Sequence, residues 1–141
     1  MITLEQNKIN TNIILTLSEA VTYTASSVYF LFRFIDETTQ VEKLFTTSDL
    51  STNIVRFNNF TITVSGSSYE NLTGGTINLP IDGKLKYEVY EMLNPTNLYL
   101  SGTSGTILET GFVQVSGSTN MEIINNTYSG SPSTYLVYNN Y

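Results

Sequence analysis

The sequence predicts an all-β fold, an antiparallel sandwich or barrel, because its hydrophobic residues follow the period of a strand rather than that of a helix. Apolar residues alternate with other residues along most of the chain, and turn-forming residues interrupt them about every eight to twelve positions. The clearest segments, Leu85 to Glu91 and Ile107 to Val115, indicate two neighbouring strands of a small sandwich. No segment combines helix caps with a helical period, so we expect little helix.

The first half of the chain contains the strongest predicted strand. An initial strand is expected at Ile13 to Leu17. Val28 to Ile35 follows, with phenylalanines on one face and mostly apolar residues on the other, which predicts a central strand covered on one side and partly covered on the other. Asp36 to Thr39 has the composition of a turn and leads into Val41 to Phe45, so these segments predict a β-hairpin.

The second half continues the strand pattern. Arg56 to Val64 resumes the alternation, and Asn71 to Leu79 contains a short strand opened by two glycines. Pro80 to Gly83 has turn chemistry, because proline presets φ and glycine accepts a positive φ. In the strand that follows, Leu85, Tyr87 and Val89 form one face; the opposite face carries Lys84, Lys86, Glu88 and Tyr90.

Composition argues against several classes of function. The 141 residues include no Cys and no His, so a cysteine nucleophile, a histidine-dependent triad and an ordinary zinc site are not expected. The formal net charge of −6 has the wrong sign for holding a phosphate backbone, so we expect no nucleic acid partner. The N-terminal residues lack the pattern of a secretory signal and no long apolar run occurs, so no membrane association is expected.

The polar residues of the chain are mostly uncharged. Only 13% of residues are charged, whereas Ser, Thr and Asn number 15, 21 and 15. A chain that is poor in Lys and Glu and contains 10 Tyr is typical of a protein that places much of its surface against other protein. The alternative is that Thr and Tyr are common here because they suit strands.

Candidate catalytic and metal sites are weak. Glu88 and Glu91 lie three positions apart in a strand and therefore project to opposite faces, so they cannot act together as an acid and a base. Asp36, Glu37 and Glu42 could hold a calcium ion across the predicted hairpin, but their spacing is not that of a calcium loop and a solvated turn is the preferred interpretation. We predict no enzyme, no cofactor and no metal.

A long connection between the two clearest strands is a candidate interface. Residues 94–106 are too many for a tight hairpin, and Leu98, Tyr99 and Leu100 lie near the middle of this connection. This apolar trio either folds back to cap its own sandwich or docks in a neighbouring subunit, since loops on a rigid scaffold often carry binding residues.

The C-terminal residues 134–141 form a second candidate interface. They follow a Ser/Gly/Pro spacer, and their composition predicts a strand. This strand is either the last one of the chain's own sheet or one that adds to the edge of another chain. The candidate interface residues of this segment are Tyr135, Leu136, Val137, Tyr138 and Tyr141.

The order of these segments resembles a family of viral proteins. The residues that carry the resemblance are Tyr29 to Phe34, Leu85 to Glu91, the loop at Asn97 and Leu98, Leu108 to Val115, Tyr135 to Asn139 and an N-terminal Ile/Leu alternation. Taken together they are similar to small virion proteins of tailed phages, and in particular to the auxiliary, or decoration, capsid proteins of crAss-like phages and relatives that infect Bacteroidetes bacteria.

The resemblance spans nearly the whole chain and consists of strand patterns rather than chemical signatures. It implies one domain over residues 1–141, an immunoglobulin-like antiparallel β-sandwich of about seven to eight strands. It further implies a protein made in the bacterial cytoplasm and fixed to the outside of the capsid, with the major capsid protein or other virion proteins as partners, or further copies of itself. Alternatives are a head-fibre, neck or tail component, or a carbohydrate-binding module in which Tyr and Asn contact the sugar, although no Trp is present for stacking.

Overall fold

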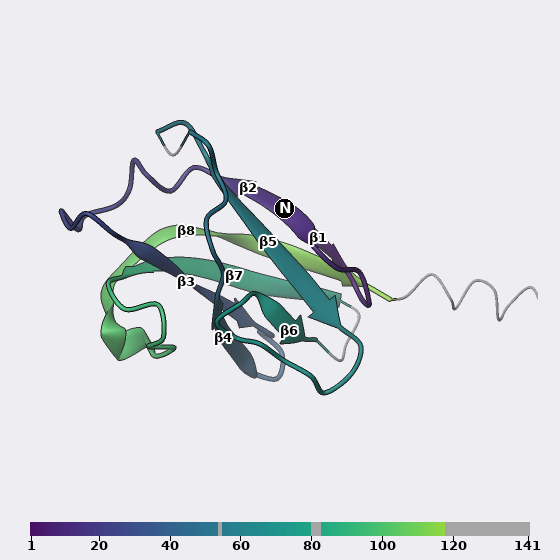
Figure 1. Cartoon of the computed structure of the whole chain (residues 1–141). Coiled ribbons are helices and arrows are strands. Elements are labelled where there is room, and N and C mark those ends of the chain that lie inside the picture. Colours follow the sequence, from purple (N-terminus) through teal and green to yellow (C-terminus); the bar gives the residue numbers. More distant parts are fainter. Residues whose placement is uncertain (54, 80–82, 118–141) are drawn as a thin grey trace, which may run out of the picture.

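Two β-sheets make up the part of the chain that the computed structural model describes, residues 1–53, 55–79 and 83–117 (Figure 1). The five-stranded sheet has the order β1-β8-β7-β3-β4 and the three-stranded sheet the order β2-β5-β6. A single 3₁₀ turn, η1 (Leu100–Gly102), is the only helical element among these residues. The strands are β1 (Ile2–Glu5), β2 (Thr11–Leu15), β3 (Tyr29–Ile35), β4 (Glu42–Thr46), β5 (Asn58–Ser65), β6 (Thr76–Asn78), β7 (Gly83–Met92) and β8 (Thr103–Ser116).

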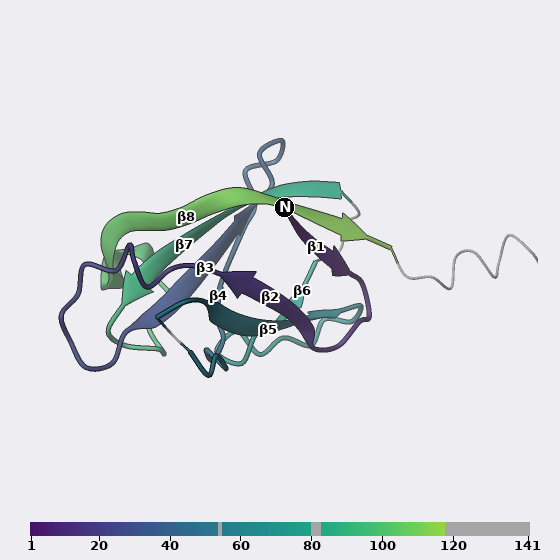
Figure 2. The ribbon, with the colours of Figure 1, turned by 90° about the horizontal axis from the view of Figure 1, so that it is seen from above.

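The two sheets face each other as the layers of a sandwich, which confirms the predicted fold class (Figure 2). Alternate residues of the strands of both sheets turn inward and form one hydrophobic core. Phenylalanine rings fill its centre: Phe60 of β5 meets Phe32 of β3 edge-on at 5.0 Å between ring centroids, and Phe32 stacks on Phe45 of β4 at 5.3 Å. The aromatic alternation that marked β3 in the sequence is therefore what joins the sheets.

The order of four strands in the larger sheet matches an immunoglobulin variable domain. There, strands G, F, C and C′ are neighbours, and β8, β7, β3 and β4 have the same order. In the other sheet β2 pairs antiparallel with β5, as strand B does with strand E. β6 departs from this pattern, because it pairs parallel with β5.

The N-terminal strand β1 was not predicted, and it pairs parallel with β8. After β1 the chain crosses from the larger sheet to the smaller one within five residues. Asn7 and Asn10 make this crossing possible, because both adopt a positive φ, 63° and 55°, which asparagine tolerates better than most residues. The backbone is tied to both layers there, since Gln6 N donates to Ser116 O at 2.9 Å and Asn7 N donates to Val64 O at 2.9 Å.

Most of the predicted strands are present with shifted ends. The strand expected at Ile13 to Leu17 is β2, which ends at Leu15; Leu17 is nevertheless fully buried, and its backbone N donates to Asn58 Oδ1 at 2.9 Å. The predicted turn at Asp36 joins β3 to β4, where Gln40 N donates to Asp36 O at 2.7 Å. The first three residues of the predicted turn at 80–83 lie outside the described residues.

Candidate functional site

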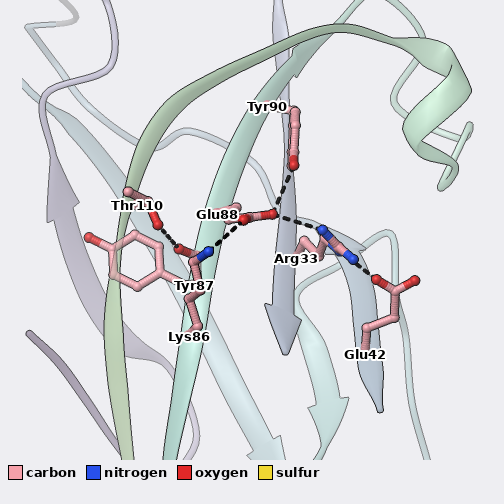
Figure 3. Close-up of polar contacts among 7 residues, drawn as sticks. All are labelled: Arg33, Glu42, Lys86, Tyr87, Glu88, Tyr90 and Thr110. Atoms are coloured by element: carbon pink, nitrogen blue, oxygen red, sulfur yellow. Dashed lines mark hydrogen bonds and ion pairs between the residues drawn. The ribbon is translucent and has the colours of Figure 1, made fainter. Parts of the chain in front are cut away.

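A cluster of charged side chains lies on the outer face of the five-stranded sheet (Figure 3). Arg33 of β3 is paired with Glu88 of β7 across the ladder, and its Nη1 lies 2.9 Å from Glu88 Oε2. The other Glu88 oxygen lies 3.1 Å from Lys86 Nζ, and Tyr90 Oη donates to Glu88 Oε2 at 2.8 Å. Arg33 also forms an ion pair with Glu42 of β4, so the cluster links three adjacent strands.

This cluster is internally balanced and does not leave a group ready for acid-base catalysis. Its two cations and two carboxylates cancel, and Glu88, at its centre, is 5% exposed. Burial raises the pKa of the Glu88 carboxyl, but hydrogen bonds from Tyr90, Lys86 and Arg33 outweigh it and hold the pKa below its usual value. Burial and the neighbouring Glu88 raise the pKa of the Tyr90 phenol. At neutral pH Glu88 therefore stays ionised and Tyr90 protonated, which suits a structural network.

Glu91 faces the opposite side of β7 from Glu88, as predicted. It is fully buried, and Oε2 accepts hydrogen bonds from the backbone N of Thr22 at 2.7 Å and of Tyr23 at 3.3 Å; the Thr22 hydroxyl donates to the other oxygen. Burial raises the pKa of Glu91, but these hydrogen bonds and one from the Ser104 side chain outweigh it and hold the pKa below its usual value. Glu91 thus fixes the connection between β2 and β3 to the sandwich.

The three acidic residues considered for calcium do not converge. Asp36 Oδ1 accepts a hydrogen bond from Thr38 N at 2.9 Å and stabilises the hairpin turn, while Glu42 is turned toward Arg33. Among the described residues no group of three or more His, Cys, Asp or Glu is arranged to hold a metal ion. The interpretation of this segment as a solvated turn fits the contacts of Asp36.

The apolar trio of the β7–β8 connection divides into two parts. Leu98 and Leu100 fold back onto the outer face of the five-stranded sheet, against a second, small apolar cluster, whereas Tyr99 is 71% exposed. Of the two alternatives for this loop, Leu98 and Leu100 follow the capping one, and Tyr99 alone projects outward. The buried residues of this cluster are Leu31, Tyr90 and Met92, and Leu44 also packs against it.

Hydrogen bonds hold this connection in shape. Asn94 Oδ1 accepts from Thr96 N at 3.0 Å, and the Thr103 hydroxyl donates to Leu100 O at 2.7 Å. Asn97 lies so close to Gly102 that a side chain at position 102 would collide with it. The loop is also shorter than the predicted 94–106, because β8 begins at Thr103.

The outer face of the three-stranded sheet has a different chemistry. We call it the Asn/Thr face, and it is made of the outward side chains of β2, β5 and β6: Asn12, Ile14, Asn59, Thr61, Thr63, Ser65, Thr76 and Asn78. None of the three strands contains a charged residue. The ladder places Thr61 opposite Asn12 and Thr63 opposite Thr76, so hydroxyl and amide groups lie side by side across the sheet.

Two open grooves of about 540 Å³ and about 700 Å³ adjoin on this face, and both are lined by Asn10, Thr63 and Thr76. No residue that lines either groove is charged. Exposed apolar side chains stand at the grooves, with Ile9 71% and Tyr69 65% exposed. The Asn/Thr face therefore combines open volume, hydrogen-bonding groups and a few apolar contacts, which are the properties of a binding surface for an uncharged partner.

Sequence reasoning singled out neither this face nor the Arg33 cluster. The sequence shows the residues, but it does not show which strands are neighbours, because that depends on pairings between distant segments. The candidate interface residues of the C-terminal segment, Tyr135, Leu136, Val137, Tyr138 and Tyr141, lie outside the described residues.

Comparisons with protein-family models, curated proteins and solved structures find no match for this chain. A search of the described residues for a helix that is long and apolar enough to cross a membrane finds none. The site must therefore be interpreted from its own chemistry.

Proposed function

We propose that this chain is a structural protein of a bacteriophage virion, an auxiliary protein that attaches to the outer capsid lattice through the Asn/Thr face. The observation that carries the proposal is the contrast in charge between the two outer faces: one holds a closed ion-pair network, and the other is open and uncharged. The resemblance of the strand sequence to auxiliary capsid proteins supplies the kind of partner.

An uncharged face lowers the cost of each contact with a lattice. Ordering a threonine or asparagine side chain costs less entropy than ordering a lysine or glutamate side chain. In addition, no charged group has to be desolvated. An interface of this kind is weak when it is used once. A protein that engages a repeating lattice through two or more contacts gains avidity without stronger individual contacts.

Quantitative mass spectrometry of purified particles tests the proposal. The expected result is a copy number equal to that of the major capsid protein or a simple fraction of it. About a dozen copies or fewer would move the protein to the neck, tail or vertices, and absence from the particle would refute a virion role.

A carbohydrate-binding module is a second candidate, favoured by the groove beside Tyr69. This groove is lined by uncharged polar side chains and presents an exposed aromatic ring, a combination that suits a neutral sugar. The test is a glycan array followed by titration of any bound sugar into Tyr69→Ala and Tyr99→Ala variants. Loss of binding in the first variant only would support the module, whereas no glycan signal together with a lattice copy number would exclude it.

A further inference from the structure

The three-stranded sheet ends at β2. Figure 1 shows β5 between β2 and β6, so the side of β2 that faces away from β5 is an edge of this sheet. In the part of the chain that the structure describes, no strand pairs with β2 on that side. The ladder between β2 and β5 runs from Thr11 to Leu15 without a bulge, so the edge is continuous over the whole strand.

The contacts of β5 show which backbone groups of β2 point to this edge. Asn59, opposite Ile14, has its backbone N and O bonded to residues 47–50 instead, at 3.1 Å and 2.7 Å. Thr61, opposite Asn12, has its O bonded to the same segment at 2.9 Å. Opposite residues of an antiparallel ladder either bond to each other or both point away. The N–H and C=O groups of Asn12 and Ile14 therefore point away from β5, and we call these four groups the β2 edge.

The β2 edge lacks the features that protect the other strand edges. Proteins block a free edge with charged residues or proline, or cover it with their own chain. β4 carries Glu42 and Lys43, and β1 carries Glu5. The backbone of the three-residue strand β6 is bonded to residues 70 and 71. β2 contains no charged residue and no proline, and its Ile14 is 57% exposed, so it is the edge best suited to receive another strand.

We propose that the β2 edge pairs antiparallel with the β2 edge of a second copy of this chain, which joins two three-stranded sheets into one of six strands. In this pairing Asn12 lies opposite Ile14 of the second copy. The N–H of each donates to the C=O of the other, and the same pair repeats on the other side of the twofold axis. Four hydrogen bonds form, and they use all the outward backbone groups of both copies.

The strand itself favours a second copy over an unrelated partner. A twofold axis beside Ile13 places β2 on its own reverse, so each of the five residues has a residue opposite it. β2 has no charge that the contact would bury or repel. The pairing lies in the plane of the sheet, so the dimer keeps the Asn/Thr face open and doubles its area. The dimer does not depend on the proposed function, because purified protein should form it without particles.

Amide hydrogen exchange followed by NMR on the full chain tests the proposal at two protein concentrations. A contact of this size is weak, so dimer formation should follow mass action. We expect the amides of Asn12 and Ile14 to exchange at least about threefold more slowly at about 1 mM than at about 10 µM. The amide of Ile13, which points to β5, is the internal control and should not change. Fast exchange of both edge amides at the higher concentration, or a monomer there by sedimentation equilibrium, would overturn the proposal.

Ile14→Lys tests the contact by a single charge. It brings two lysines together across the twofold axis and should leave the protein monomeric at about 1 mM. Val41→Lys is the matched control, because Val41 is 66% exposed and lies beside β4 in the other sheet, and this variant should dimerise like the wild type. Unchanged melting temperatures would show that both variants are folded. A dimer of Ile14→Lys as stable as that of the wild type, or equal loss in both variants, would contradict the proposed contact.

Two single-cysteine variants test the register. Because the chain has no Cys, Asn12→Cys and Ile14→Cys can cross-link only through the introduced thiols. Opposite residues of a hydrogen-bonded antiparallel pair have Cα atoms about 5.5 Å apart, which suits a disulfide. Oxidation of an equal mixture should therefore give the mixed dimer in excess over dimers of either variant with itself. An excess of the latter would overturn the proposed pairing.

Discussion

The outer faces of the two sheets differ in charge and in how far other parts of the chain cover them. The five-stranded sheet carries the Arg33 cluster in its middle and is capped at one end by Leu98 and Leu100. The three-stranded sheet carries no charge and remains open along two adjoining grooves. The first face is bound to other parts of its own chain, so its residues should matter for stability. The second is free for a partner, so its residues should matter for binding.

The largest expected effect on stability comes from Glu88→Ala. This change leaves Arg33, Lys86 and Tyr90 without their shared acceptor and should lower the free energy of unfolding by about 2–4 kcal/mol, less than for a fully buried ion pair because both cations keep some contact with water. Thr61→Ala on the Asn/Thr face should stay within about 0.5 kcal/mol of the wild type. Urea unfolding of both variants measures the difference, and equal losses would contradict the assignment of the two faces.

Acid pH should lower the stability that the carboxylates of Glu88 and Glu91 give to the folded protein. The pKa values of Glu88 and Glu91 are lowered in the folded protein, so the stability that they contribute is fully present above the unfolded value, about 4.3, and is lost as the pH falls through the folded values. Thermal melts from pH 7 to pH 2.5 should show a constant midpoint down to about pH 5 and a decline below it.

Glu88→Gln provides the control for this pH dependence. Its melting temperature should lie below that of the wild type at pH 7, and the gap should close as the wild-type carboxyl becomes protonated. A gap that stays constant down to pH 2.5 would show that the charge of Glu88 is not what stabilises the cluster.

Substitutions in the β7–β8 connection, which we call the capping loop, should have a smaller effect on stability. Leu98→Ser and Leu100→Ser each remove a half-buried side chain from the small apolar cluster and should cost about 1 kcal/mol. Tyr99→Ser should change stability by less than about 0.5 kcal/mol, since its ring is largely in water. If Tyr99→Ser destabilised the protein as much as its neighbours do, the division of the trio into two capping residues and one exposed residue would be wrong.

The parts of the fold that could be predicted from the sequence are those with long, strongly periodic strands. The phenylalanines of β3 and the alternation of β7 and β8 identify their own faces, because period two needs no knowledge of the neighbouring strand. The division of the trio Leu98, Tyr99 and Leu100 was not predicted from the sequence. It follows from the backbone, because Tyr99 is extended, with φ −126° and ψ 143°, so its neighbours on either side turn to the sheet while it turns away.

The parts that were missed depend on pairings between distant segments. β1 is four residues long and its partner lies more than 100 residues later, so local sequence gives little sign of it. The Arg33 cluster required the register that places Arg33 opposite Glu88, and the Asn/Thr face required the one that places Asn12 opposite Thr61. A strand sequence states which residues share a face, but neighbours across strands follow only from the assembled sheet.

Addition of positive charge to the Asn/Thr face should have the smallest effect on stability and a large effect on binding. Thr61→Lys together with Thr63→Lys places two cations on a face that has none, and because both positions are on the solvent side of β5 the free energy of unfolding should change by less than about 0.5 kcal/mol per substitution. Under the proposed function, incorporation into particles should fall at least tenfold, since each lysine must be desolvated in the contact. Mass spectrometry of particles grown with the variant measures this.

Thr3→Lys is the matched control, because Thr3 is exposed on β1 in the other sheet, opposite Gln114 of β8. It adds the same kind of charge to the same protein and should leave incorporation unchanged. If Thr3→Lys reduced incorporation as much per lysine as the double variant, the loss would reflect net charge rather than a contact made by one face. Loss confined to the double variant would mean that the uncharged Asn/Thr face is the one that the assembled particle covers.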